Sequence, residues 1–222
     1  MAARAKRSAL LGMFLGLASA AHAECGPMED AERASHRALT WADFTRDVPR
    51  GEERSASGDE TAILLTTALR VDALELRSER AGGEFVASVE ARCVRAVLVK
   101  ARTGRKRAAR AVWDMQPESS DQDLRHEQGH FDLTQRCAQH LDVALERVTQ
   151  RGASAGDATR ALQREAARLY REASAACQEL QNRYDRETRH GHKPRAQARW
   201  AERIAAELAS GVSGNERELA AR

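Results

Sequence analysis

The pentapeptide His126-Glu127-Gln128-Gly129-His130 constrains this chain more than any other stretch. If these residues are helical, the two histidines lie four residues apart on one face and can bind a single metal ion. Glu127 then leans toward the space beside the metal, where it can take a proton from water. The pattern predicts a zinc site of the hydrolytic kind. Its alternative is a helix whose two inward histidines only form hydrogen bonds.

The sequence around the motif favours a helix. Ser119, Ser120 and Asp121 offer N-cap oxygens, and Pro117 keeps the preceding chain out of the helix. Apolar residues then recur at helical spacing with the two histidines, which places both histidines on the buried stripe. Gly129 costs about 1 kcal/mol relative to Ala inside a helix, so we expect it to permit close approach of another element.

Residues 1–23 have the features of a secretory signal peptide. A basic start precedes an apolar and small-residue run over residues 8–20, and Ala21-His22-Ala23 fits signal-peptidase cleavage. We expect cleavage after Ala23 and a periplasmic or secreted protein without stable membrane insertion. The segment carries three basic residues and no acidic ones, so its removal takes the formal net charge from +3 to zero. This balance gives no reason to expect nucleic acid as a partner.

Alternation with period two predicts a small antiparallel sheet before the motif. Charged residues alternate with Leu69 and Val71 in a first run, a second run extends from Phe85 to Cys93, and a third lies near residues 97–99. A helix over the first run is the alternative, because the run is rich in Ala and Leu.

The second half of the chain predicts two long helices joined by a short loop. Asp157 is the expected N-cap of the second helix, whose inner stripe extends to Tyr184. Folding this antiparallel hairpin about residues 154–157 sets the motif opposite residues 180–188. A shorter third helix follows. The residues thereby brought to the metal end are Tyr184, Asp185 and His190.

Four cysteines remain after processing, and an exported chain is expected to pair them. The hairpin places Cys137 and Cys177 at matching levels on facing stripes. We therefore predict disulfides between Cys137 and Cys177 and between Cys25 and Cys93.

The expected domain plan follows from these elements. It comprises a signal peptide over 1–23, an N-terminal arm and loop over 24–58, one domain over 59–210 with its sheet in 59–113 and its helices in 120–208, and a polar tail over 211–222.

A catalytic zinc ion usually has three protein ligands and an open position for water. The candidates near the metal end are His190, His192, Glu179 and Asp185, whereas His140 does not share the motif stripe. Position along the hairpin favours His190, followed by His192 and Glu179. The alternative for His190 is an exposed loop histidine.

Three motifs in order carry a family resemblance. In chain order they are LTWADF at residues 39–44, HEQGHFD at residues 126–132 and YDRETRHG at residues 184–191, the last followed by Gln197 and Trp200. Together they resemble a family of exported bacterial proteins of unknown function whose members are commonly labelled predicted secreted zinc-dependent proteases. The resemblance covers roughly Leu39 to Ile204.

The resemblance implies an exported, zincin-like metallopeptidase with His126, His130 and His190 on Zn²⁺ and Glu127 as general base. Tyr184 is similar in position to the family's tyrosine, and two roles stay open for it: a hydrogen bond to the oxyanion, or closure of the hairpin core. We expect an α+β fold in which a small antiparallel sheet packs on a long helical hairpin carrying the HExxH motif. By analogy with zincins, a peptide or protein substrate would lie along a sheet edge. The alternative function is a non-catalytic exported zinc-binding or envelope interaction module, and the oligomeric state stays open.

Overall fold

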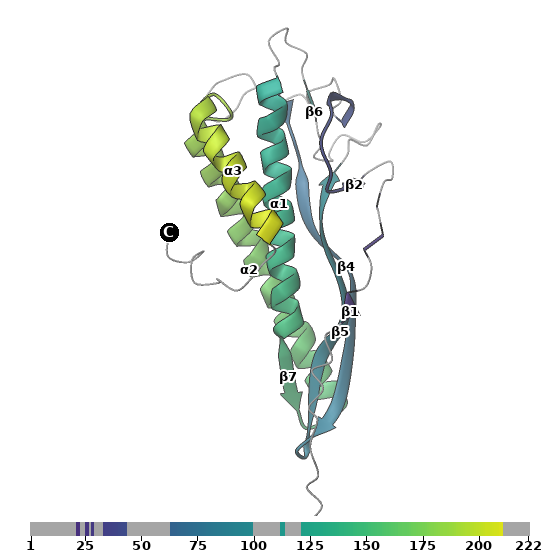
Figure 1. Cartoon of the computed structure of the whole chain (residues 1–222). Coiled ribbons are helices and arrows are strands. Elements are labelled where there is room, and N and C mark those ends of the chain that lie inside the picture. The colour runs from purple at the N-terminus through teal and green to yellow at the C-terminus, as the bar shows by residue number, and fades with distance from the viewer. Residues whose placement is uncertain are drawn as a thin grey trace, which may run out of the picture.

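The computed structural model describes residues 21–22, 25–26, 28, 33–43, 63–99, 112–113 and 121–210. A long ribbon of two strands, β4 (Thr67–Ala81) and β5 (Glu84–Val99), runs beside the helices α1 (Asp121–Arg147) and α2 (Ala155–Thr188) (Figure 1). Helix α3 (Pro194–Ser210) packs beside α1 and α2 at the end of the molecule away from the β4–β5 turn. The fold is therefore α+β, with a small, mainly antiparallel sheet and three helices.

Strand β5 is the centre of the sheet. β4 pairs with it antiparallel over nearly its whole length, and Gly82 and Gly83 make the connecting turn with positive φ angles of 59° and 92°. Three short strands also pair with β5: β7 (Thr149–Gly152) at residues 85–88, β1 (Ala21–His22) at 91–92 and β2 (Arg33–Ser35) at 97–99. A separate two-stranded sheet is formed by β3 (Ile63–Leu64), which precedes the ribbon in the sequence, and β6 (Val112–Trp113), which follows it.

The prediction of two separate runs within residues 85–99 was wrong, because β5 is one continuous strand. The expected alternation places Arg92 on the outer face between Ala91 and Cys93, but Arg92 occupies a core position. The Arg92 side chain is completely buried and binds the carboxylates of Asp142 and Glu146 on α1 at 2.9 Å and 3.1 Å. These carboxylates offset the cost of burying the guanidinium inside the sheet–helix layer.

The connection between the two long helices also differs from the prediction. Only a short loop was expected between the two long helices, but Thr149–Gly152 form strand β7 there because they pair with the end of β5. The N-cap of α2 is Ser154 rather than Asp157. The Ser154 Oγ accepts a hydrogen bond from the Asp157 backbone N–H at 3.1 Å, so Asp157 lies in the first helical turn.

Both predicted disulfides are confirmed. Cys25 pairs with Cys93, and Cys137 pairs with Cys177, with Cα–Cα distances of 5.4 Å and 5.9 Å. Disulfides are compatible with an exported protein. Of the helices that the structure describes, none is both long enough and apolar enough to cross a bilayer.

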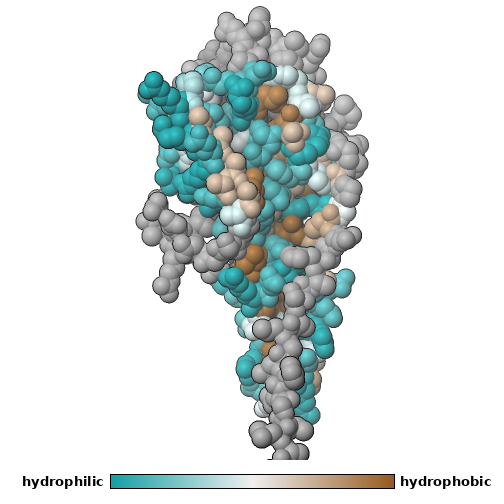
Figure 2. Space-filling view, in the orientation of Figure 1, coloured by the Kyte–Doolittle hydropathy of each residue, from teal (hydrophilic) through white to brown (hydrophobic). Residues whose placement is uncertain are grey.

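The packing around the motif holds the N-terminal arm in place. Phe131, just after the motif, is fully buried against Leu98 of β5 and Leu39 of the arm. The side chain of Gln128 accepts a hydrogen bond from the Leu39 backbone N–H at 2.6 Å. On the visible face, hydrophobic residues form separate patches in a largely hydrophilic surface (Figure 2). Among the described residues, Tyr170 is the large apolar side chain classed as exposed, at 38%.

Candidate metal centre

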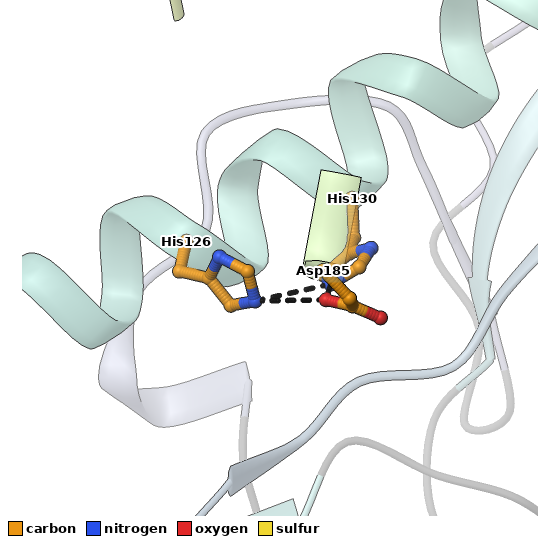
Figure 3. Close-up of side chains that lie close together, drawn as sticks. All are labelled: His126, His130 and Asp185. Atoms are coloured by element: carbon orange, nitrogen blue, oxygen red, sulfur yellow. Dashed lines mark hydrogen bonds and ion pairs between the residues drawn. The ribbon is translucent and has the colours of Figure 1, made fainter. Parts of the chain in front are cut away.

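Three side chains from two helices converge at the motif (Figure 3). His126 and His130 project from successive turns of α1, and Asp185 projects from α2. The two imidazole Nε2 atoms lie 3.2 Å apart. Asp185 Oδ1 lies 3.2 Å from His126 Nε2 and 2.9 Å from His130 Nε2. One nitrogen from each ring and one carboxylate oxygen therefore surround a common point.

The spacing of these atoms fits a bound zinc ion. Two ligand atoms that each lie about 2.0–2.2 Å from one ion at a tetrahedral angle are about 3.3–3.5 Å apart. Two of the three separations here are 3.2 Å, and the third is 2.9 Å. Although Asp185 Oδ1 is buried and close to both rings, it has no hydrogen bond of acceptable angle. Because Asp185 Oδ1 lies near both Nε2 atoms without a hydrogen bond to either, it is well placed to bind the same cation as they do.

In the metal-free protein, the same proximity perturbs the titration of the ligands. Burial opposes the charged form of His130, but the carboxylates of Asp185 and Glu127 outweigh it and raise the pKa of His130 to about 9. Burial likewise raises the pKa of Asp185, and the two imidazoles outweigh it and hold that pKa well below its usual range. The pocket thus favours a cation beside the Asp185 carboxylate, whether a proton on the ring or a metal ion.

Glu127 lies beside this cluster and is 7% exposed. Burial raises the pKa of its carboxyl group, while the charges of His130 and His126 act in the opposite direction. Burial thus makes the Glu127 carboxyl group bind a proton more readily than an exposed one does, which is the direction that suits a general acid–base residue.

The Nδ1 atom of each imidazole, on the side of the ring away from the cluster, is in hydrogen-bond contact with a glutamine. His126 Nδ1 lies 3.2 Å from Gln197 Oε1 on α3, and His130 Nδ1 lies 2.5 Å from Gln181 Oε1 on α2. Sequence reasoning gave these glutamines no role. The spacing of Gln181, four residues after inward-facing Cys177 and four before Asp185, was the available signal.

Tyr184 lies directly behind the histidines and is fully buried. Its ring stacks on His126 with centroids 4.8 Å apart, and its hydroxyl donates to the His126 carbonyl oxygen at 3.0 Å. Burial raises the pKa of this phenol. A Cβ on Gly129 would clash with the Tyr184 ring and hydroxyl, which confirms the expected close approach at this glycine. These contacts agree with the role of closing the hairpin core.

His190, the favoured third ligand in the sequence, lies at the edge of the cluster. Its Nδ1 atom is 3.5 Å from Asp185 Oδ1, and its side chain is 65% exposed. Helix α2 ends at Thr188, and Arg189 and His190 both adopt left-handed backbone conformations. The described cluster of potential ligands contains Asp185 instead, so a ligand role for His190 stays a prediction.

The other two alternatives lie apart from the cluster. Glu179 is exposed and forms an ion pair with Arg186 at 3.2 Å. His192 is exposed after the end of α2.

Comparison with known proteins adds a family but no activity. No curated protein and no solved structure matches the chain. A family model described as "Bacterial protein of unknown function (DUF922)" matches residues 32–191, a stretch that contains the metal cluster, Glu127 and Gln181. Because this match covers more than half of the sequence, the chain belongs to the DUF922 family of bacterial proteins of unknown function.

Proposed function

We propose that this protein is an exported, zincin-like metallopeptidase that hydrolyses peptide bonds, with Zn²⁺ held by His126, His130 and Asp185. The observation that carries the proposal is the convergence of these three ligand atoms beside the buried carboxyl group of Glu127. The signal-peptide pattern of residues 1–23 and the two disulfides support export.

The chain's own residues have distinct tasks in this proposal. Zinc, when bound, supplies a Lewis acid that activates water and polarises the peptide carbonyl. Glu127 accepts the proton of the attacking water on its carboxylate and returns it to the leaving amine. Its raised pKa suits both transfers. Asp185 supplies a negatively charged ligand for the Zn²⁺ ion, which the two neutral imidazoles cannot provide.

A peptide is the substrate class that the neighbouring strand favours. Among the described strands, β4 pairs only with β5, and it begins at Thr67, whose hydroxyl contacts that of Thr134 on α1 at 2.6 Å. The Leu69 carbonyl points away from β5, since the Tyr170 hydroxyl donates to it at 3.0 Å. Strand alternation directs the Thr67 backbone groups the same way. An extended peptide can add to this edge at Thr67, one turn from His130, whereas the Leu69 carbonyl is already bonded to Tyr170.

The test is metal content and hydrolysis measured on the same preparations. Protein exported to the periplasm would be analysed by elemental mass spectrometry and screened against a peptide library. We expect one zinc per chain and cleavage in wild type, loss of zinc in His126→Ala, and retained zinc without cleavage in Glu127→Gln. Folded protein that takes up no added zinc would refute the proposal.

A second candidate is a non-catalytic zinc-binding module. It is favoured by the position of His190 near the same Asp185 oxygen, because a fourth protein ligand would close the site as in structural zinc centres. In that case Glu127→Gln changes nothing measurable, and His190→Ala weakens zinc binding.

A further inference from the structure

We propose that Gln181 and Gln197 are positioning residues that fix the tautomer and the ring orientation of His130 and His126, so that both Nε2 atoms face the metal. This inference rests on the proposed metal centre and concerns how the chain orients the two neutral rings for the metal. Its basis is that each glutamine connects the ring of one histidine to that histidine's own backbone carbonyl, directly for Gln181 and through the Tyr184 hydroxyl for Gln197.

The hydrogen bonds of Gln181 fix the direction of its amide. Its Nε2 atom donates to the His130 carbonyl at 3.0 Å and to the Thr134 hydroxyl at 3.0 Å. A carbonyl can only accept, so the amide nitrogen must face it, and the amide oxygen must face His130 Nδ1 at 2.5 Å. An acceptor at that distance requires a proton on Nδ1. The lone pair of a neutral His130 ring is therefore on Nε2.

A longer series of hydrogen bonds, through Tyr184 and Gln197, places the proton of the His126 ring on Nδ1 as well. The Tyr184 hydroxyl donates to the His126 carbonyl at 3.0 Å, so its oxygen accepts from the Gln197 amide nitrogen, with which it is in hydrogen-bond contact. The Gln197 oxygen then faces His126 Nδ1 at 3.2 Å. His126 Nδ1 also carries the proton, which leaves its Nε2 lone pair directed toward Asp185.

The two sets of hydrogen bonds come from different helices, since Gln181 lies on α2 and Gln197 on α3. Each set begins at the ring of a histidine and ends at the backbone carbonyl of the same histidine. Rotation of either ring would therefore break its hydrogen bond to the glutamine. Outer-shell acceptors of this kind commonly set the tautomer and orientation of metal-binding histidines. Here the acceptor is a neutral amide, so orientation is achieved without adding negative charge beside Asp185.

The test is zinc affinity, measured on the exported full chain by competition with a chromophoric chelator. Gln181→Leu and Gln197→Leu remove the acceptor and are expected to weaken binding by about 10–100-fold. Gln181→Glu keeps an acceptor oxygen for His130 Nδ1 but loses the amide that donates to the His130 carbonyl, so it is expected to recover only part of the lost affinity. Gln178→Leu is the matched control on α2, because Gln178 is exposed and its amide binds Asn182 away from the cluster. Its affinity should equal that of wild type.

Nitrogen NMR of the zinc-loaded wild-type protein supplies a readout that does not depend on the variants folding. We expect both rings to show protonated Nδ1 and metal-bound Nε2. Metal on Nδ1 of either ring, or wild-type affinity in both folded leucine variants, would overturn the positioning role while leaving the metal centre intact. Wild-type protein that binds no zinc would overturn both.

Discussion

The disulfide between Cys137 and Cys177 joins α1 to α2 two helical turns from the metal cluster, and contacts between the two helices continue from it to the cluster. Four residues further along α2, Gln181 reaches His130 and Thr134, and four residues beyond that Asp185 reaches the ligand nitrogens. Successive turns of α2 thus contact successive turns of α1. The covalent link fixes the register of the two helices at the level from which the ligands are positioned.

Removing this disulfide should weaken both the fold and zinc binding. The Cys137→Ser, Cys177→Ser double variant loses a cross-link over a sequence separation of 40, for which chain entropy predicts about 4 kcal/mol of unfolding free energy. Urea denaturation measures the stability, and chelator competition measures the affinity for zinc.

The other disulfide provides the matched control. Cys93 lies on β5 next to Arg92, which contacts α1 at Asp142, three turns beyond His130. Serine at both Cys25 and Cys93 should lower stability while leaving the zinc affinity of folded protein unchanged. Equal loss of affinity in the two double variants would contradict a specific role for Cys137 and Cys177.

The identity of the third ligand can be settled by two substitutions. Asp185→Asn removes the charged oxygen that lies within 3.2 Å of both rings and should weaken zinc binding by more than about 100-fold, since even outer partners contribute about 10–100-fold. His190→Ala removes a side chain that is 65% exposed and should have a much smaller effect. The reverse order of effects would make His190 the ligand.

The sequence predicted the arrangement of the site because regular helices transmit position over long distances. The spacing of His126 and His130, together with a short connection between two helices, was enough to set the motif opposite Tyr184 and Asp185 and to pair Cys137 with Cys177. These features depend only on helical geometry and the point at which the hairpin folds.

The features that were missed depend on tertiary contacts. Strand β7 (Thr149–Gly152) has no apolar alternation, and it is a strand because the end of β5 offers it a partner. Arg92, which the alternation placed on the outer face, is buried because its counter-charges come from α1. Position along the hairpin favoured His190 over Asp185, but helix α2 continues through Asp185 and ends at Thr188. That continuation turns Asp185 inward and leaves His190 beyond the helix end.

The stability of the metal-free protein should fall as the pH rises above 6.5. The pKa of His130 is raised from 6.5 to about 9, so the folded protein binds this proton more tightly than the unfolded chain does. The resulting stabilisation is complete below pH 6.5 and is lost as the pH rises through about 9. Urea denaturation in chelator should show a decrease of about 1–3 kcal/mol over this range.

His130→Gln is the control for this titration, because it removes the titrating ring and should flatten the pH dependence. An unfolding free energy for wild type that is constant or rises between pH 6.5 and 9 would show that Asp185 and Glu127 do not hold a proton on His130.

Gly129→Ala should destabilise the protein although alanine is the better helix former. The added Cβ would overlap the Tyr184 ring and hydroxyl, and Tyr184 is fully buried and bonded to His126, so it cannot move aside. Overpacking of this kind costs about 1–3 kcal/mol, which exceeds the gain of about 1 kcal/mol in helix propensity. Gly156→Ala in the first turn of α2 is the matched control, because its Cβ would meet only the flexible end of Arg160 and a hydroxyl at ordinary contact distance. Thermal unfolding of both variants should therefore show a lower midpoint for Gly129→Ala and an equal or higher one for Gly156→Ala. If both glycines respond alike, Tyr184 has room to yield, and the close packing behind the histidines does not disfavour alanine at position 129.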